Sequence, residues 1–222
     1  MSIYIGVDGK ARKVKSAYIG DTYGNAQVIY KAGIVPNGYI PVQYIYNDTG
    51  TEQKINTEII PNAYTRLIVK CSFASNFGPG NSNYMMVGTS NLNVGASGWN
   101  NLGYIYINAG SQVAQRTITV NKIYTVDINK NLSKESYLDN EYLFKNQDPI
   151  NTTNKITIFS QYEVAGFRLY SCAIYQSMTT GILTKNYIPC IKIEGNIAGL
   201  WESVKGVFIG NTKYGAGDPI VS

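Results

Sequence analysis

The sequence predicts an all-β protein, a two-sheet antiparallel jelly-roll sandwich preceded by a small N-terminal β-hairpin module. Short runs rich in tyrosine and β-branched residues recur about every ten residues, and Gly, Asn, Asp or Pro turn signals close them. No stretch of a dozen residues shows the 3.6-residue periodicity of an amphipathic helix. With 222 residues, the chain can bury a sizeable core, and this many strands favour two packed sheets over one closed barrel.

The composition is poor in charge and rich in tyrosine. Charged residues make up 15% of the chain, and 19 tyrosines stand against six phenylalanines. Tyrosine suits β-strands and surfaces that combine apolar area with a polar tip. The formal net charge is +5, and residues 1–31 hold five cations against two carboxylates, so the remainder is nearly neutral. A nucleic-acid-binding protein would carry a denser basic face, so we expect no nucleic-acid partner.

Several chemistries are excluded by residue type. The absence of histidine removes zinc sites of the histidine type and histidine-based acid–base catalysis. Cys71, Cys172 and Cys190 form neither a paired framework nor a CxxC motif, so we expect buried free thiols. No apolar run reaches about 18 residues, and the N-terminus lacks the apolar core of a signal peptide. We therefore expect no membrane partner, and no cofactor.

Residues 1–31 contain an internal echo, YIGVDGKAR followed by YIGDTYGNA, and each copy predicts a small hairpin. Asp8-Gly9 and Gly24-Asn25 are the turn dipeptides. Hairpins this small are marginal alone, so we expect them to become ordered on another surface. The alternative is a frayed N-terminal arm. We assign residues 1–31 to an attachment module, residues 32–38, with Pro36 and Asn37-Gly38, to a linker, and residues 39–222 to the sandwich.

The main domain is predicted to consist of short strands separated by turns. Alternation along 66–73 places Leu67, Val69 and Cys71 on one face. The segment 95–103, GASGWNNLG, has the composition of a loop, and the charged segment 130–141 predicts one short helix or a hairpin turn. The other expected strands are 42–46, 54–60, 84–87, 104–108, 115–120, 123–129 and 155–159.

The stretch 165–211 organises the rest of the domain. It predicts a series of hairpins in which Gly195-Asn196 forms a tight turn, because both residues tolerate positive φ. Such strands cannot stand alone and must pack on a second sheet supplied by the earlier chain. The strands expected here are 167–175, 187–193, 197–201 and 207–209.

An enzymatic site is not supported by the acidic residues. A glycosidase needs two carboxylates facing one cleft, and a Glu-x-Asp-x-x-Glu spacing is absent. Asp139 and Glu141 are two residues apart and are the nearest candidates, but YLDNEYLF is typical of a solvated turn. We therefore predict no catalytic residue. The acidic residues are scattered, so no metal site is predicted, and calcium lacks support.

Ligand binding is the better hypothesis. Sugar sites combine aromatic faces with amide and hydroxyl groups. That mixture occurs in two loop-like segments, so we predict ligand-binding residues there, with ordinary packing at the rim of the domain as the alternative. Trp201, by contrast, has alternating apolar neighbours and is expected in the core. The predicted ligand-binding residues are Trp99 with Asn100 and Asn101, and Tyr84 with Asn81 and Asn83.

An ordered set of motifs resembles a known family. They are VQYI at 42–45, TGTEQKINT at 49–57, IP at 60–61, TR at 65–66, TVDINKN at 125–131, FRLYSC at 167–172, YIPC at 187–190, GLW at 199–201 and GVF at 206–208. This set, over residues 39–217, resembles the laminin-G-like, concanavalin-type jelly-roll domains of bacteriophage structural proteins and bacterial surface proteins. YIGVDGKARKVKSAYIG at 4–20 resembles short repeats at the ends of phage virion proteins. The family usually ends in a Gly-Thr-Phe type strand, and this chain departs from that pattern after residue 213.

The resemblance implies a bacteriophage virion structural protein of the fibre, tail-appendage or capsid-decoration type, assembled in the host cytoplasm. Residues 1–31 would bind other virion proteins, and the sandwich would be displayed outward, with host-cell-surface glycans as a candidate ligand. The alternatives are a carbohydrate-binding module of a bacterial surface protein and a glycoside hydrolase. Homo-oligomer formation stays open. The residues expected to make the virion attachment are Tyr4, Lys10, Arg12, Lys13 and Tyr18.

Overall fold

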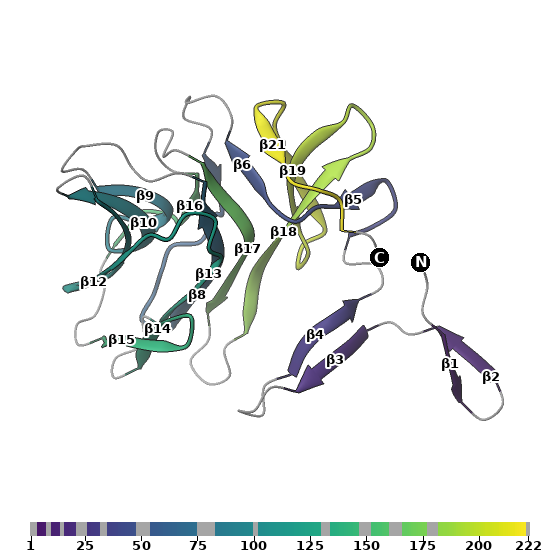
Figure 1. Cartoon of the computed structure of the whole chain (residues 1–222), viewed down its shortest axis with the longest axis horizontal. Coiled ribbons are helices and arrows are strands. Elements are labelled where there is room, and N and C mark those ends of the chain that lie inside the picture. The colour runs from purple at the N-terminus through teal and green to yellow at the C-terminus, as the bar shows by residue number, and fades with distance from the viewer. Residues whose placement is uncertain are drawn as a thin grey trace.

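The structure is a computed structural model, and it confirms the all-β prediction. It describes residues 4–7, 10–13, 16–20, 26–31, 35–47, 54–74, 83–99, 102–129, 134–146, 152–159, 166–176 and 182–220, and for 4–31 it describes the backbone alone. No helix occurs within these ranges, and their paired strands are antiparallel. Two sheets pack face to face as a jelly-roll-like β-sandwich (Figure 1).

The smaller sheet has six strands. Its centre is a meander of hairpins, because β9, β10, β11 and β12 follow one another in both sequence and space. Two very short strands from other parts of the chain complete the far edge. The spatial order is β12 (Gln112–Thr117), β11 (Leu102–Ala109), β10 (Leu92–Trp99), β9 (Asn83–Thr89), β16 (Thr157–Ile158) and β7 (Ile55–Asn56).

The larger sheet has eleven strands. Its main path runs through β15 (Glu141–Lys145), β14 (Glu135–Leu138), β13 (Tyr124–Asn129), β8 (Thr65–Phe73), β17 (Phe167–Gln176), β18 (Leu183–Lys192), β19 (Ile197–Glu202) and β20 (Val207–Gly210). Three short strands lie off this path: β5 (Tyr39–Pro41) pairs with β18, β6 (Ile45–Asn47) with β17, and β21 (Tyr214–Ala216) with β6. β21 is thus the last strand, whose form the sequence left open.

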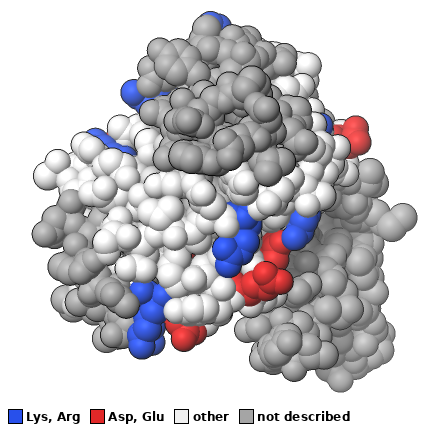
Figure 2. All heavy atoms as spheres, turned by 60° about the vertical axis from the view of Figure 1, so that its left-hand side comes forward, with Lys and Arg blue, Asp and Glu red and all other residues white. Residues whose placement is uncertain are grey.

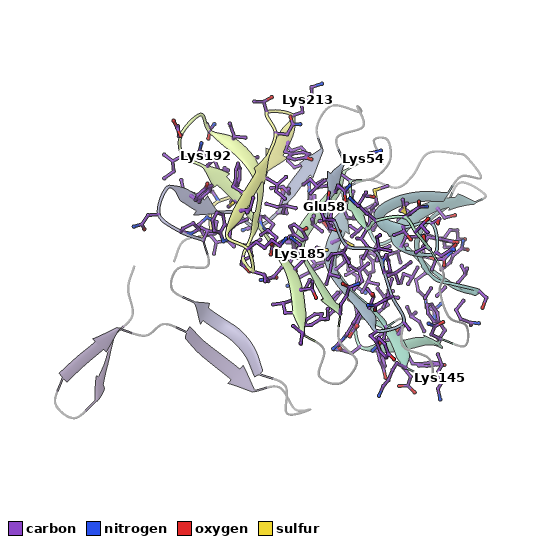
Figure 3. All side chains as sticks on the ribbon, turned by 180° about the vertical axis from the view of Figure 1, so that it is seen from behind. Lys54, Glu58, Lys145, Lys185, Lys192 and Lys213 are labelled. Atoms are coloured by element: carbon purple, nitrogen blue, oxygen red, sulfur yellow. The ribbon has the colours of Figure 1, made fainter. Side chains whose placement is uncertain are left out.

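The core lies between the two sheets, where side chains from both fill the space (Figure 3). The predicted alternation along β8 is confirmed, since Leu67, Val69 and Cys71 are fully buried. They belong to one cluster with Ile105 and Ile107 of the smaller sheet. Each fully buried side chain of this kind contributes about 1.5–3 kcal/mol. The three cysteines are buried free thiols, as predicted, and burial raises the pKa of Cys172 to about 12.

The C-terminal meander was predicted correctly. β17, β18, β19 and β20 follow in order, and Gly195 and Asn196 adopt φ values of 80° and 49° in the turn between β18 and β19. Within the segment 130–141, the described residues 134–141 belong to a hairpin rather than a helix, with Asp139 and Asn140 at positive φ between β14 and β15. This is the geometry of a two-residue type I′ turn, which matches the twist of the flanking strands.

Two short strands, β5 and β6, lie between β17 and β18 where these two long strands do not pair with each other. β17 pairs with β6 through Arg168 and Leu169, and with β18 beginning at Cys172. β18 in turn pairs with β5 from Cys190 onward. The predicted strand 42–46 is therefore only partly formed. Ile45 and Tyr46 belong to β6, whereas Val42 donates its N–H to Pro189 O at 3.1 Å and makes an isolated bridge to Pro219.

Three other expectations are corrected. The described residues of the segment 95–103 are in strands rather than a loop. Residues 95–99 belong to β10, and Leu102 and Gly103 begin β11, because backbone pairing across the hairpin outweighs the loop-like composition. Only Ile55 and Asn56 of 54–60 form a strand, and Glu58 has a φ of 64°, which no strand allows. Trp201 is not in the core. It is half-buried on the opposite side of β19 from Leu200 and packs against Tyr39, with ring centroids 5.1 Å apart.

The N-terminal segment forms the two hairpins that the sequence echo predicts. β1 (Tyr4–Val7) pairs with β2 (Lys10–Lys13), and β3 (Ser16–Gly20) pairs with β4 (Ala26–Lys31). Each hairpin is a sheet of its own, and neither pairs with a described strand of the sandwich (Figure 1). Within the expected linker, the described residues 35–38 already contact the sandwich, since the Ile193 N–H donates to Gly38 O at 3.0 Å.

Candidate functional site

A pocket of about 300 Å³ lies on the outer face of the larger sheet. We call it the outer pocket; it is lined by Ile68, Thr125, Asp127, Tyr137 and Asn140. The alternation of β8 and β13 produces it, because their core faces carry Leu67, Val69, Val126 and Ile128. Residues between these must face outward. Asp127 is then directly opposite both Ile68 of β8 and Tyr137 of β14.

The hairpin turn after β14 forms one wall of the outer pocket. Thr125 N–H donates to Asp139 Oδ1 at 2.7 Å, and Asp139 N–H donates to Thr125 O at 2.8 Å. Lys122 Nζ lies 2.9 Å from Asp139 Oδ2. These contacts hold the turn against β13 and bring Asn140 to the pocket. Asp139 therefore has a structural role, and Glu141 is exposed at the start of β15.

The Asp127 carboxylate is held in place by Arg66. Arg66 Nε donates to Oδ1 at 2.8 Å and Nη2 to Oδ2 at 2.5 Å, a bidentate contact between residues 61 apart in sequence. The guanidinium also lies over the Tyr175 ring, 5.8 Å from its centroid. The hydrogen bond to Asp127 raises the pKa of Arg66. The Asp127 side chain remains 21% exposed, so the carboxylate can accept hydrogen bonds from a ligand.

Tyr137 supplies the aromatic surface of the pocket. Its hydroxyl donates to Glu135, and this bond raises the pKa of Tyr137. Its ring meets the Tyr142 ring edge-on, with centroids 6.4 Å apart. The pocket thus combines an aromatic ring and an aliphatic side chain with a carboxylate, a hydroxyl and an amide. Asp127 is the single carboxylate in the described lining, whereas glycoside hydrolysis uses a pair.

A second group of side chains lies on the same outer face. We call it the tyrosine–arginine cluster, and it consists of Tyr44, Tyr46, Tyr170 and Arg168. Tyr46 is directly opposite Arg168, which in turn is opposite Ser72 of β8. A register shift between Leu169 and Ser171 places Tyr170 within 3.3 Å of the Ser72 hydroxyl. Insertion of β6 beside β17 therefore creates this group.

Four described ion pairs lie on the surface, between Arg66 and Asp127, Lys122 and Asp139, Lys155 and Glu58, and Lys192 and Glu194. On the face drawn in Figure 2, uncharged residues dominate, and acidic side chains lie beside basic ones. Figure 3 places Lys145 and Lys213 at opposite ends of the sandwich, so these cations do not gather on one face. Within the described ranges, no three Cys, Asp or Glu residues lie close enough together to hold a metal ion. The described residues contain no helix that is long and apolar enough to cross a membrane.

The structure places some of the sequence-predicted ligand residues together. Ser97 of β10 pairs with Asn83, Ala96 pairs with Tyr84, and Trp99 pairs with Leu102 across the next hairpin. The backbones of Asn83, Tyr84 and Trp99 thus meet at one end of the smaller sheet, away from the outer pocket. Their side chains, and all of Asn81, Asn100 and Asn101, lie outside the described residues.

The predicted attachment residues lie in the N-terminal hairpins. Tyr4 pairs with Lys13 across the first hairpin, Lys10 and Arg12 lie in β2, and Tyr18 lies in β3. Their side chains are not among the described ones, so their role stays a prediction.

The residues of the outer pocket were not among the ligand-binding residues predicted from the sequence. One signal could have found them. Asp127 interrupts the apolar alternation of a predicted strand on its outward side, and Arg66 does the same in the strand 66–73. Two residues of opposite charge at outward positions of two strands can be cross-strand neighbours if the strands are adjacent in one sheet. The sequence did not show that β8 and β13 are adjacent.

The chain was also compared with known proteins. No family model and no curated protein matches it. Among solved structures, a crystal structure of a proposed carbohydrate-binding protein from Bacteroides ovatus is similar, with a TM-score of 0.47 and 11% sequence identity. The match covers 84% of this chain and 60% of that one, so this chain spans less than two thirds of its length.

Proposed function

We propose that the sandwich is a non-enzymatic carbohydrate-binding module and that the outer pocket holds one sugar residue. The observation that carries this proposal is the Arg66-oriented Asp127 carboxylate beside the Tyr137 ring. A sugar presents C–H groups on its ring faces and hydroxyls at its edges. Tyr137 and Ile68 offer apolar surface to the former. Asp127, Thr125 and Asn140 can bond the latter.

The binding mode follows from the chemistry of these groups. A carboxylate fixed by a bidentate arginine accepts hydroxyl hydrogen bonds without having to reorganise, which lowers the entropic cost of binding. An isolated acidic residue without a second carboxylate does not provide the acid and base that hydrolysis needs. The proposed module therefore holds saccharides without cleaving them.

Substitutions in the outer pocket test this proposal. We expect Asp127→Asn and Tyr137→Ala each to weaken binding of a neutral oligosaccharide, such as cellohexaose or mannohexaose, by about tenfold or more, since a charge-assisted bond or a stacking surface is lost. Isothermal titration calorimetry against a panel of such oligosaccharides measures the effect. Tyr106→Ala, on the outer side of the smaller sheet, is the matched control and should bind normally. Equal affinities of the pocket variants and the wild type would refute the pocket.

A second candidate function is the virion structural role that the family resemblance implies. The N-terminal hairpins support it, because their described strands pair only within each hairpin and leave room for pairing with another protein. In this proposal residues 1–31 attach the chain to a particle, and the sandwich binds host glycans. Removing residues 1–31 should abolish incorporation into phage particles, as measured by mass spectrometry of purified particles. Incorporation at the normal level would contradict this role.

A further inference from the structure

The tyrosine–arginine cluster carries a positive charge without a carboxylate partner. Arg168 Nη1 donates to Asn121 Oδ1 at 3.0 Å, and the guanidinium carbon lies 4.9 Å from the centroid of the Tyr44 ring. None of the described carboxylates forms an ion pair with Arg168. Arg66, which also faces outward, is neutralised by Asp127. The guanidinium is partly exposed and has no described carboxylate beside it, so it can pair with an anion that a ligand supplies.

Two rings of the cluster, Tyr44 and Tyr46, occupy space that glycines leave open. A Cβ atom added at Gly217 would come within 2.6 Å of the Tyr44 ring, and one added at Gly215 within 2.1 Å of the Tyr46 ring. Both rings thus lie directly against the backbone at β21. Tyr44 and Tyr170 also contact each other, with centroids 5.2 Å apart. The cluster is therefore a packed aromatic surface, and Arg168 lies against it through the Tyr44 ring.

The free edge of Arg168 suits a carboxylate. A guanidinium has five N–H donors in a planar fork, and one hydrogen bond, to Asn121, is accounted for. A carboxylate can take two parallel N–H donors from such a fork. The neighbouring Tyr46 and Tyr170 rings offer hydroxyls and apolar faces to the ring that carries the carboxylate.

Building on the proposed carbohydrate-binding function, we propose that the tyrosine–arginine cluster binds the uronic-acid residue of an acidic saccharide. The cluster and the outer pocket lie on one face and are connected along β8. Ser72 in the cluster and Ile68 in the pocket are separated by four residues, roughly 13 Å of strand. Lys70 lies between them, faces outward opposite Thr125 and Ser171, and is exposed. One acidic oligosaccharide that lies over Lys70 can thus occupy the outer pocket and the tyrosine–arginine cluster at the same time.

The test compares an acid with its neutral counterpart. Oligogalacturonate and its methyl ester have the same rings and differ in the carboxylate charge. We expect wild-type protein to bind the acid about tenfold or more tightly than the ester. Arg168→Gln should remove this preference, and Arg168→Lys should retain part of it, because lysine keeps the charge and loses the fork. Arg116→Gln, which removes one cation from the smaller sheet, is the matched control and should keep the full preference.

Calorimetric titration of each variant separates this inference from the proposed function. Thermal unfolding first establishes that the Arg168 variants are folded. If cellohexaose or mannohexaose binds and oligogalacturonate binds no better than its ester, the uronic-acid site is refuted and the outer pocket stands. If the acid binds through Arg168 while Asp127→Asn has no effect on any saccharide, the pocket is refuted and the cluster stands. Absence of binding to every saccharide overturns both.

Discussion

Gly88 shows how a single residue determines the close approach of two strands in the smaller sheet. Its φ is 134°, a conformation that side-chain-bearing residues rarely adopt. A Cβ atom there would lie 2.0 Å from Leu92 O and 2.6 Å from Asn93 Cα. The obstruction is backbone of the neighbouring strand β10, so no side-chain movement can relieve it. Glycine at this position therefore allows β9 and β10 to approach each other.

Gly88→Ala should lower the free energy of unfolding by about 2–3 kcal/mol, because it adds both backbone strain and a steric conflict. Urea unfolding followed by circular dichroism measures the loss. Gly38→Ala is the matched control: its φ is 93°, but no atom lies within 4 Å of the added Cβ. It should be less destabilising than Gly88→Ala. Equal losses would show that strain alone, without the conflict with β10, determines the cost.

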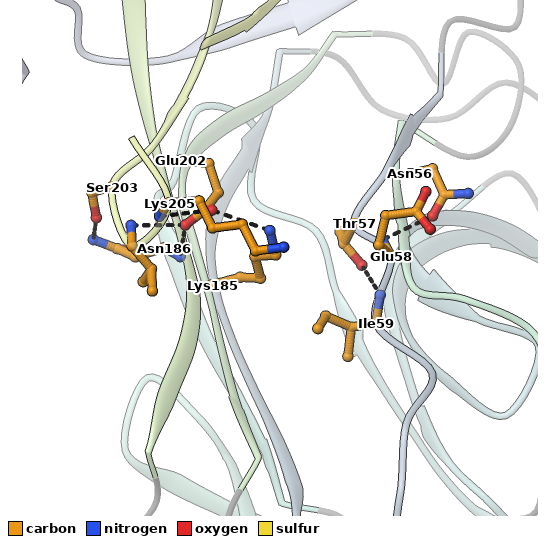
Figure 4. Close-up of polar contacts among 10 residues, drawn as sticks. Asn56, Thr57, Glu58, Ile59, Lys185, Asn186, Glu202, Ser203 and Lys205 are labelled. Carbon is orange, nitrogen blue, oxygen red and sulfur yellow. Dashed lines mark hydrogen bonds and ion pairs between the residues drawn. The ribbon is translucent and has the colours of Figure 1, made fainter. Parts of the chain in front are cut away.

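The β19–β20 hairpin is closed by a buried carboxylate at its base. Glu202 is 1% exposed, and its oxygens accept hydrogen bonds from Val204 N (2.9 Å), Lys205 N (3.1 Å) and Lys185 Nζ (3.1 Å; Figure 4). Burial acts to raise the pKa of Glu202, but the backbone and Lys185 hydrogen bonds outweigh it and lower that pKa overall. The charged carboxylate thus stabilises the turn and neutralises the buried Lys185.

Glu202→Gln should therefore destabilise the protein by about 3 kcal/mol at pH 7, because it leaves the buried Lys185 charge uncompensated. The folded pKa lies below the unfolded value of about 4.3. The contribution of Glu202 is therefore present above that value and lost as pH falls through the folded pKa. Urea unfolding from pH 7 to pH 3 should show wild type and variant converging at the acid end.

The control for this hairpin is Glu194→Gln. The Glu194 side chain is 86% exposed and pairs with Lys192 at the surface, so its loss should leave stability nearly unchanged. If the free energies of unfolding of wild type and Glu202→Gln differed by the same amount at every pH, the charge of the carboxylate would not be the source of its stabilising effect.

The sandwich as a whole is expected to fold without its N-terminal hairpins. The described core cluster begins at Val42, and β1 to β4 pair only within their own hairpins. A chain starting at residue 32 should therefore retain the β-type circular dichroism spectrum and the urea midpoint of the full chain. A loss of about 1 kcal/mol or more, well beyond the effect typical of surface changes, would show that the hairpins stabilise the sandwich.

Much of the larger architecture could be predicted from local patterns. The alternation of Leu67, Val69 and Cys71 identified the buried face of β8, and Gly195-Asn196 identified the turn before β19. Both signals are contained in a few neighbouring residues. The loop assigned to 95–103 failed for the opposite reason, since a Gly- and Asn-rich composition does not reveal the cross-strand hydrogen bonds that extend β10 and β11.

The sequence by itself determined the all-β class, the faces of its longer strands and the scarcity of charge, because these depend on residue type and on a two-residue period. Only the tertiary structure decided which outward residues meet. Arg66 reaches Asp127 because β8 pairs with β13, and Arg168 joins Tyr46 because β6 inserts beside β17. Strand order and register arise from packing of the whole core, and no short stretch of sequence contains that information.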